Sequence, residues 1–188
     1  QIVIVPIIPN DKDKDSVMKV VNQLNDSLSE FRVIIDDRSE VSPGFKFNEW
    51  EQKGVPLRVE VGPKDIEKNT ILVSRRDDES KNSYPMDDVQ NTIKKLLDEI
   101  QDNLYKNSEN TLKENTTHVE SFSELIEVLN SKKGFVSCFW KENKEDELKI
   151  KEETSATLRC YPLENTDSEK AVNSDSENGN FAIFSKAY

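Results

Sequence analysis

The sequence predicts an α/β protein of two domains, with a helix-covered sheet over residues 1–106 and a small α+β domain over residues 107–188. Two observations predict the sheet: short β-branched runs that suit buried strands, and intervening segments whose apolar residues recur at helical spacing. A third observation places the boundary, because a stretch rich in Asn, Ser, Thr and Glu begins after Lys106. Strands that alternate with helices favour a sheet flanked by helices.

The first domain is expected to run strand, helix, strand, helix and two further strands, with a long helix at its end. The expected strands lie at 2–8, 31–35, 57–61 and 70–74, and the first two are predicted to be buried. Ser16 is the expected N-cap of a helix over 16–28. Pro43 opens a short helix that Gly54 closes, and Pro85 starts the long helix.

The second domain is expected to contain two helices and three strands. Ser121 and Glu124 form a capping box before an apolar run, and a further helix is expected at 145–153. Strands are expected at 134–140, 156–161 and 181–184, whereas the polar segment 164–180 is expected to be a loop or partly disordered. His118 is predicted to be a solvated side chain in a polar linker. The expected core residues are Phe135, Phe139, Trp140, Leu158, Ile183 and Phe184.

The composition describes a protein with a modest core and a very polar surface. Hydrophobic and charged residues each make up 34%, and the formal net charge is −11. Because general nucleic-acid binding depends on many phosphate contacts, such acidity restricts any RNA contact to a local, selective one. No apolar run approaches the roughly 20 residues of a membrane helix, and the start resembles no signal peptide. The chain begins without Met, so we expect a piece of a longer polypeptide.

The segment from residue 43 to residue 65 differs from the rest of the chain. It reads "PGFKFNEWEQKGVPLRVEVGPKD" and mixes apolar residues with both signs of charge. Between Pro43 and Arg76, bases slightly outnumber acids, although the chain as a whole is acidic. The sequence therefore leaves two interpretations of this segment open, a solvated connection and a surface that recognises a ligand.

The same segment, extended to "DDRSEVSPGFKFNEWEQKGVPLRVEVGPKDIE", closely resembles the anticodon-binding domain of prolyl-tRNA synthetases of the archaeal/eukaryotic type. The opening "QIVIVPI" is similar to the first strand of that domain, whose sheet is mixed. The motifs "IKEETSATLRCYP" and "FSKAY" resemble the family's small C-terminal domain. The resemblance thus runs from one end of the chain to the other.

The resemblance implies a part of a class II aminoacyl-tRNA synthetase, a ligase of protein biosynthesis. Such enzymes attach proline to tRNA(Pro) with ATP and Mg²⁺ in a catalytic domain that precedes the anticodon domain. No catalytic motif of that domain occurs here, so we expect this chain to be inactive alone and to hold no catalytic residue. The implied partners are tRNA(Pro) and the catalytic domain of the same polypeptide, in a cytoplasmic homodimer without membrane contact.

The guanine recognition that the resemblance implies would account for the mixture of acids and bases in this segment. Proline tRNAs share two adjacent anticodon guanines, and guanine offers acceptors at O6 and N7 for Arg or Lys. Its N1 and N2 donors can bind a carboxylate, and unstacked single-stranded bases expose these edges. The residues that the resemblance assigns to anticodon binding are Glu51, Arg58, Lys64, Asp65 and Lys81. By their layout, the first four are expected on one rim of the sheet.

Other residues near this segment have plausible roles of their own. Lys46 and Lys53 are candidates for phosphate contacts, which position a nucleic acid without specifying its sequence. The aromatic residues Phe45, Phe47 and Trp50 are expected to pack the short helix on the sheet, with base stacking as an alternative for one of them. Asp36 and Asp37 could form a metal or acid/base pair, but the neighbouring Arg38 favours an ion pair or a turn cap.

No zinc site is expected in the second domain, although the family commonly holds one structural zinc there through four cysteines. The positions that match those cysteines are occupied by Lys141, Asp146, Ala171 and Ser174. Structural zinc needs about four nitrogen, oxygen or sulfur ligands in a tetrahedral array. We therefore predict that the core, without metal, stabilises this domain.

Two further function classes are alternatives to tRNA recognition. Catalysis by the chain itself lacks support, because there is no P-loop, no GxSxG motif and no Cys/His nucleophile pair. The two cysteines, Cys138 and Cys160, favour free thiols in a reducing cytosol.

The second alternative is that the C-terminal domain mainly braces the catalytic domain. A terminal tyrosine, Tyr188, is expected to be flexible or differently packed without that domain.

Overall fold

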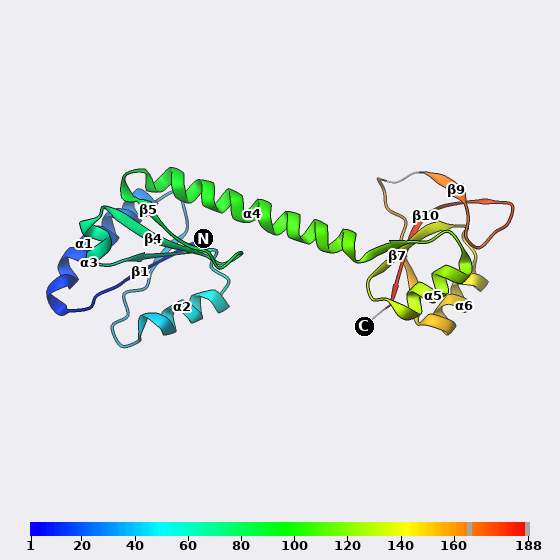
Figure 1. The fold of residues 1–188 in the computed structure, drawn as a ribbon, viewed down its shortest axis with the longest axis horizontal. Coiled ribbons are helices and arrows are strands. Elements are labelled where there is room, and N and C mark those ends of the chain that lie inside the picture. Colours follow the sequence, from blue (N-terminus) through cyan, green and yellow to red (C-terminus); the bar gives the residue numbers. More distant parts are fainter. Residues whose placement is uncertain (165–166, 187–188) are drawn as a thin grey trace. The chain divides into compact units, whose positions relative to one another are not determined.

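The computed structural model describes residues 1–164 and 167–186. It divides into two compact units, Gln1–Lys106 and Asn107–Tyr188, each with its own sheet and core (Figure 1). The predicted α/β class, with a mixed sheet and helices in the first unit, is confirmed. The expectation for Tyr188 lies outside the described residues.

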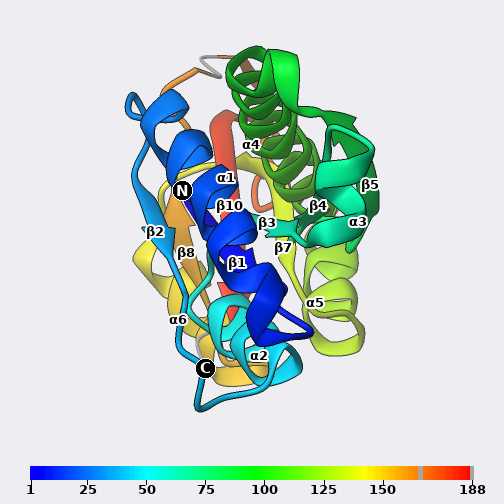
Figure 2. The same cartoon turned by 90° about the vertical axis from the view of Figure 1, so that its left-hand side faces the viewer.

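The sheet of the first unit has the strand order β2-β1-β3-β4-β5. Its strands are β1 (Ile2–Pro6), β2 (Val33–Ile35), β3 (Leu57–Val61), β4 (Thr70–Arg75) and β5 (Lys81–Pro85). The central β1 runs parallel to both β2 and β3, whereas β4 is antiparallel to β3 and to β5. Figure 2 shows β2 and β5 at opposite edges of this sheet.

Helices cover both faces of the first sheet, as the alternation of strands and helices predicts. The helices are α1 (Lys14–Ser27), α2 (Pro43–Gln52), α3 (Pro63–Glu67) and α4 (Val89–Glu114), with short 3-10 turns at Asp11–Asp13 and Met86–Asp88. α1 and α4 lie on one face and α2 lies on the other (Figure 1). Leu57, Val59 and Val61 pack with the buried residues of α1 and α4. Since strand side chains alternate, Arg58 and Glu60 point to the face that carries α2.

The first unit differs from the sequence prediction at several element ends. β2 is an edge strand rather than a buried one, and Ile34 is 51% exposed. The Ser16 hydroxyl donates to the carbonyl of Asp13 (2.8 Å) and caps no helix. β1 ends at Pro6, not at residue 8. The polar strand β5 and the short α3 were not predicted, and α4 starts at Val89 because the preceding residues form β5 and a 3-10 turn.

In its described residues, 107–164 and 167–186, the second unit has one sheet with two helices, α5 (Phe122–Ser131) and α6 (Lys144–Thr154). Its strands are β6 (Thr116–His118), β7 (Phe135–Trp140), β8 (Ala156–Cys160), β9 (Ser168–Lys170) and β10 (Asn178–Lys186). The strand order is β6-β7-β10-β8, and β9 pairs with β10. The Ser121 hydroxyl accepts a hydrogen bond from the Glu124 amide, as the capping box predicts. The Glu124 carboxylate, however, accepts from the amide of Glu120, one residue before Ser121. Trp140, Phe184 and Ile150 are buried in the core.

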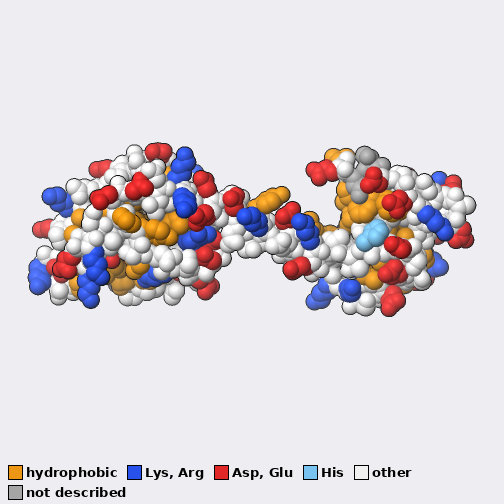
Figure 3. Space-filling view, turned by 45° about the horizontal axis from the view of Figure 1, so that its top comes forward, with side chains coloured by type: hydrophobic (Ala, Val, Ile, Leu, Met, Phe, Trp, Pro, Cys, Tyr) orange, Lys and Arg blue, Asp and Glu red, His pale blue; other side chains and the backbone are white. Residues whose placement is uncertain are grey.

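The predicted core of the second unit is only partly right, because alternate residues of β7 and β10 face away from it. Phe139 and Phe181 pair across the two strands and contact His118 on β6, at centroid distances of 6.0 and 6.1 Å. His118 is exposed but belongs to a strand rather than a polar linker. Figure 3 shows the histidine bordered by hydrophobic side chains. Phe135 is 38% exposed, and the segment expected as a loop contains β9 and the start of β10.

Candidate nucleic-acid interface

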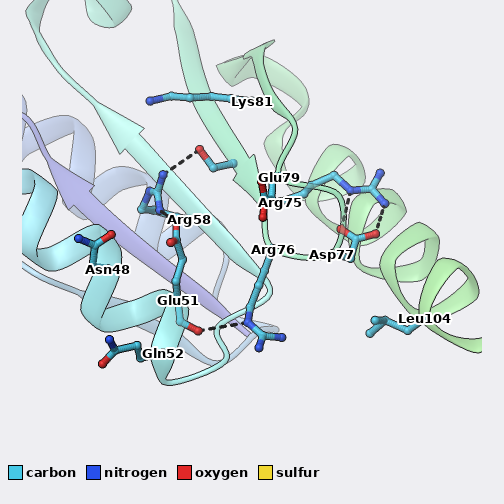
Figure 4. Close-up of a pocket in the computed structure, with 11 residues that line it drawn as sticks. Asn48, Glu51, Gln52, Arg58, Arg75, Arg76, Asp77, Glu79, Lys81 and Leu104 are labelled. Carbon is cyan, nitrogen blue, oxygen red and sulfur yellow. Dashed lines mark hydrogen bonds and ion pairs between the residues drawn. The ribbon is translucent and has the colours of Figure 1, made fainter. Parts of the chain in front are cut away.

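A groove of about 800 Å³ opens in the first unit on the α2 face of the sheet (Figure 4). It is lined by Asn48, Glu51, Gln52, Arg58, Ser74, Arg75, Arg76, Asp77, Glu79, Lys81 and Leu104. Three of the five residues predicted to bind an anticodon, namely Glu51, Arg58 and Lys81, therefore lie in one groove. Both signs of charge are present within it.

The strand register places the predicted cations side by side. Arg58 of β3 pairs with Ser74 of β4, and Ser74 in turn pairs with Lys81 of β5. Residues directly opposite each other in a sheet project from the same face. The hairpin between β4 and β5 thus brings Lys81, which is distant in sequence, to the same surface as Arg58.

The guanidinium of Arg58 is held by three side chains, and the Arg58 side chain is only 12% exposed. Nη1 donates to Glu51 (2.7 Å), Nε donates to Glu60 (3.2 Å) and Nη2 donates to Ser74 (3.2 Å). Its central carbon also lies 4.0 Å from the ring centroid of Phe47, in a cation–π contact. Phe47 therefore supports Arg58 rather than only packing the helix on the sheet. The arrangement fixes where the remaining N–H groups of Arg58 point.

Glu60 is a residue of this site that the sequence prediction missed. It is 5% exposed, and its carboxylate accepts from Lys81 Nζ (2.9 Å), from Arg58 and from the Ser74 hydroxyl (3.4 Å). A buried carboxylate is stable when charged partners and hydrogen bonds surround it. One signal could have identified it, because Glu60 follows Arg58 by two residues in "LRVEV" and so shares its face.

The Glu51 carboxylate is the exposed acceptor of the groove. It comes from the last turn of α2, and its side chain is 54% exposed. Within residues 1–164 and 167–186, Arg58 is its one hydrogen-bond partner, through Oε1. A carboxylate has about four acceptor positions on two oxygens, so Glu51 can accept further hydrogen bonds from a ligand.

Lys64 and Asp65 lie away from this groove. They belong to α3, which follows the far end of β3, and the three residue steps from Arg58 to Val61 already span about 10 Å. The Asp65 carboxylate accepts from the Gly62 amide (2.9 Å) and so caps the start of α3. Lys64 is exposed on the same short helix. The four residues expected on one rim of the sheet, Glu51, Arg58, Lys64 and Asp65, therefore do not share it.

A buried ionic cluster around Asp36 attaches α2 to the sheet. Arg38 donates to both Asp36 oxygens (2.8 and 2.7 Å), and the Trp50 indole donates to one of them (2.7 Å). The hydrogen bonds from Arg38 hold the pKa of Asp36 well below its ordinary value, and Asp36 raises the pKa of Arg38. Lys46 is 4% exposed and donates to the Asp36 carbonyl (3.0 Å), so it is not available for a phosphate. The ion pair expected for Asp36 is present.

The remaining expectations for α2 have mixed outcomes. Lys53 bonds Glu49 (2.6 Å) and lies over the Trp50 ring, yet about half of its side chain stays exposed. Phe45 does not pack against the sheet, because it is 55% exposed. Ser42, at the N-terminus of the helix, accepts from the Phe45 amide (3.3 Å). At the other end, Gly54 has a φ of +77°, which supports its predicted role in closing the helix.

A second ionic cluster fixes the hairpin between β4 and β5. Arg75 binds Asp77 through two nitrogens (3.1 and 2.8 Å) and Glu99 of α4 through a third (2.9 Å). Asn103 of α4 also donates to Asp77 (2.8 Å). These bonds from Arg75 lower the pKa of Asp77 and raise the pKa of Arg75. The groove is thus bounded by a hairpin that is tied to a long helix.

The positions matched to zinc ligands in the second unit are joined by hydrogen bonds. Asn173 accepts from the Lys141 amide (3.0 Å) and donates to the Lys141 carbonyl and the Asp146 carboxylate, both at 2.9 Å. Ala171 is buried and has no donor atom in its side chain. These side chains do not fit a zinc ion, because a lysine, an alanine, a serine and one engaged carboxylate supply too few ligands.

Other site types find little support in the described residues. Among them, no cluster of three or more His, Cys, Asp or Glu side chains is placed to hold a metal ion. Within the same residues, every helix is too short or too polar to cross a bilayer. Cys138 and Cys160 are free thiols, and burial raises the pKa of Cys138 to about 12. A thiol with so high a pKa is a poor nucleophile.

Two family models match the chain. The model described as "Anticodon binding domain" covers residues 1–96, and the model described as "Prolyl-tRNA synthetase, C-terminal" covers residues 122–188. The groove and its ionic clusters, apart from Glu99 and the residues beyond it, lie within the first match. The resemblance found in the sequence is confirmed.

Curated relatives with the name proline–tRNA ligase align with the whole chain or most of it. The relative from Roseiflexus sp. (strain RS-1) is 41% identical over 193 residues, which cover 100% of this chain and 40% of that protein. The relative from Alkaliphilus oremlandii (strain OhILAs) is 43% identical, covering 87% of this chain and 34% of its own length. Proline–tRNA ligase 2 of Clostridioides difficile (strain 630) is 40% identical, covering 100% and 39%.

The chain spans between about a third and two fifths of the length of these relatives. The first family model matches just over half of this chain, and the second matches most of the rest. The fold agrees with both models, since each described unit has its own sheet, helices and core. The chain therefore belongs to the anticodon-binding domain family, joined to a C-terminal domain of the prolyl-tRNA synthetase type.

Proposed function

We propose that this chain recognises the anticodon of tRNA(Pro), as the C-terminal part of a proline–tRNA ligase that attaches proline to tRNA with ATP. One observation carries the proposal: an exposed carboxylate, Glu51, lies beside Arg58 and Lys81 in one groove of an anticodon-binding domain. The names of the relatives indicate that the amino acid is proline. The groove offers the hydrogen-bond donors and acceptors that could recognise bases.

The chemistry of the groove suits guanine better than the other bases. Glu51 can accept from the N1 and N2 donors of guanine, which adenine lacks in that pattern. The free N–H groups of Arg58 and Lys81 can donate to guanine O6 and N7. Lys64 lies on α3, beyond the far end of β3, and is too distant to join the same base, so we assign it and Asp65 to a neighbouring part of the tRNA. This division of the five predicted residues is part of the proposal.

The chemical step is assigned to the rest of the enzyme. We place the binding of ATP and Mg²⁺ and the aminoacylation itself in a catalytic domain of the same polypeptide, within a cytoplasmic homodimer. Since we place the sites for ATP and proline in that domain, we expect no aminoacylation by this chain alone. Its contribution is the selection of the tRNA.

Exchange of Glu51 for glutamine is expected to weaken guanine discrimination without unfolding the chain. The unchanged protein should bind tRNA(Pro) more tightly than it binds a tRNA(Pro) variant in which adenine replaces one anticodon guanine, by about 1–3 kcal/mol. In Glu51→Gln this difference should shrink by about half, because the amide keeps only one acceptor oxygen. The affinities can be measured by filter binding at two salt concentrations.

The matched control is Glu67→Gln, which removes the same charge from an exposed residue of α3 outside the groove. It should leave the discrimination unchanged. Equal binding of the two tRNAs by the unchanged protein would contradict the proposed function. A separate experiment compares the tRNA affinity of a chain of residues 1–106 with that of the whole chain. Equal affinities would indicate that the second unit mainly braces the catalytic domain. The aromatic surface around His118 is available for that contact.

We also propose that the second unit uses the hydrogen bonds of Asn173 in place of zinc. Asn173→Ala is expected to lower the free energy of unfolding of this unit by about 1–2 kcal/mol, because three hydrogen bonds are lost. A chelator should leave the unfolding curve of the unchanged protein as it is. Asn178→Ala, at an exposed position, is the control. One zinc per chain in a metal analysis of chelator-free protein would overturn this proposal.

A further inference from the structure

Arg76 is a groove residue that neither the composition nor the resemblance identified. It lies in the hairpin between β4 and β5, lines the groove together with Glu51, and is exposed. The arginines near it are engaged: Arg58 binds Glu51 and Glu60, and Arg75 binds Asp77 and Glu99. Across residues 1–164 and 167–186, Arg76 is the arginine of this groove without an ion pair to a carboxylate.

The direction of the Arg76 side chain is set by two hydrogen bonds. Its amide donates to the carbonyl of Pro56 (3.0 Å), and its Nε donates to the backbone carbonyl of Glu51 (3.1 Å). Figure 4 shows the guanidinium extending past this carbonyl, at the end of α2. Because Nε is occupied, the terminal nitrogens remain for a ligand. Two parallel N–H groups on such nitrogens match the oxygens of a phosphate.

The hairpin holds Arg76 in place without using its charge. The neighbours on either side, Arg75 and Asp77, bind each other and reach Glu99 and Asn103 of α4. The backbone at residue 76 is thereby fixed while its side chain lies on the groove side. A guanidinium that is already oriented loses less conformational entropy when it binds an anion.

We propose that Arg76 contacts a phosphate of the tRNA backbone next to the anticodon bases that the groove reads. This inference rests on the proposed function and adds a positioning contact to it. An exposed cation in water distinguishes bases poorly, whereas it suits a phosphate, whose contacts fix register and orientation. Arg58 and Lys81, which Glu60 holds inside the groove, face the bases, and Arg76 faces the backbone at the margin.

The test measures tRNA binding by Arg76→Ala and Arg76→Lys over a range of salt concentrations. Arg76→Ala should weaken binding by about two- to fivefold, as expected for one exposed ion pair. The loss should be the same for tRNA(Pro) and for a tRNA with adenine at one anticodon guanine. The slope of log affinity against log salt should fall by about 0.7–1. Arg76→Lys should keep most of the slope, because it keeps the charge.

Arg32→Ala is the matched control, because Arg32 is exposed on the same unit and lies outside the groove. If Arg76→Ala changes affinity and slope no more than Arg32→Ala, the phosphate contact is refuted. If it instead abolishes the preference for guanine, Arg76 reads a base and the inference is equally overturned. The proposed function fails separately, when the unchanged protein itself shows no preference between the two tRNAs.

Discussion

Replacement of Asp36 by alanine is expected to lower the free energy of unfolding of the first unit by about 3–5 kcal/mol, which is a typical loss when a buried ion pair loses one partner. Asp36 is 4% exposed and accepts hydrogen bonds from Arg38 and from the Trp50 indole. Without the carboxylate, the buried Lys46 retains only its bond to the backbone carbonyl of residue 36. α2, which carries Glu51, should become the least stable element of the unit.

Urea unfolding followed by tryptophan fluorescence measures this loss. Each unit contains one tryptophan, Trp50 in the first and Trp140 in the second, so each tryptophan reports on the unfolding of its own unit. The adjacent Asp37 is exposed and provides the matched control. Asp37→Ala should change the free energy of unfolding by no more than about 0.5 kcal/mol. Similar losses in the two variants would show that the buried cluster does not stabilise α2.

The unchanged protein and Asp36→Ala should also differ in how their stability responds to acid. The pKa of Asp36 in the folded protein lies well below its ordinary value, chiefly because Arg38 donates hydrogen bonds to the carboxylate. A carboxyl group with a lowered pKa adds stability above its unfolded pKa of about 4, and that stability is lost as the pH falls toward the folded value. The unchanged protein should therefore lose more stability below about pH 4 than Asp36→Ala does.

Replacement of Glu60 by alanine is expected to have the second largest effect, on stability and on recognition together. The free energy of unfolding should fall by about 2–3 kcal/mol, because Glu60 accepts charge-assisted hydrogen bonds from Arg58 and Lys81. The loss is smaller than for Asp36, since Arg58 keeps Glu51 and Lys81 is already 43% exposed. Lys81 would lose its fixed direction, so discrimination between guanine and adenine should fall as well.

Glu60→Gln separates the two effects of this position. Glutamine fills the same space and retains an acceptor oxygen, so the fold should be largely kept while the charge that holds both cations is lost. The preference for tRNA(Pro) over the adenine variant should still decrease, and Glu67→Gln should not decrease it. If Glu60→Gln binds and discriminates like the unchanged protein, Glu60 has only a structural role.

The sequence predicted the elements whose side chains follow a clear period. The central strands β1 and β3 are β-branched and apolar on the buried face, and α2 begins at Pro43 with Gly54 beyond its end. β5 was missed because "KNSYP" is polar, as an edge strand with little burial can be. In the second unit, Phe139 and Ile183 were assigned to the core since hydrophobicity alone does not reveal which face of a sheet is covered.

The candidate site was predictable only where the residues were linked by a motif. Glu51 and Arg58 are close in sequence and bond each other in the structure. Lys64 and Asp65 are about as close to Arg58 in sequence as Glu51 is. The rest of β3, however, runs between Arg58 and these two residues and keeps them away from the groove. The importance of Glu60 depends on Ser74 and Lys81 from two other strands, so it appears only once the sheet register is known. The roles of the five residues in tRNA binding remain predictions.

The bond between Glu51 and Arg58 also bears on ligands that the groove should refuse. In the free protein this acid and this base satisfy each other, so an anion that arrives alone finds the Arg58 charge already compensated. The acceptor positions of Glu51 and the N–H groups of Arg58 that this bond leaves free call for a ligand that offers donors and acceptors together. Guanine offers both, whereas a free phosphate offers Glu51 no matching donor and brings its own charge close to that carboxylate. We therefore expect the groove to bind free phosphate weakly.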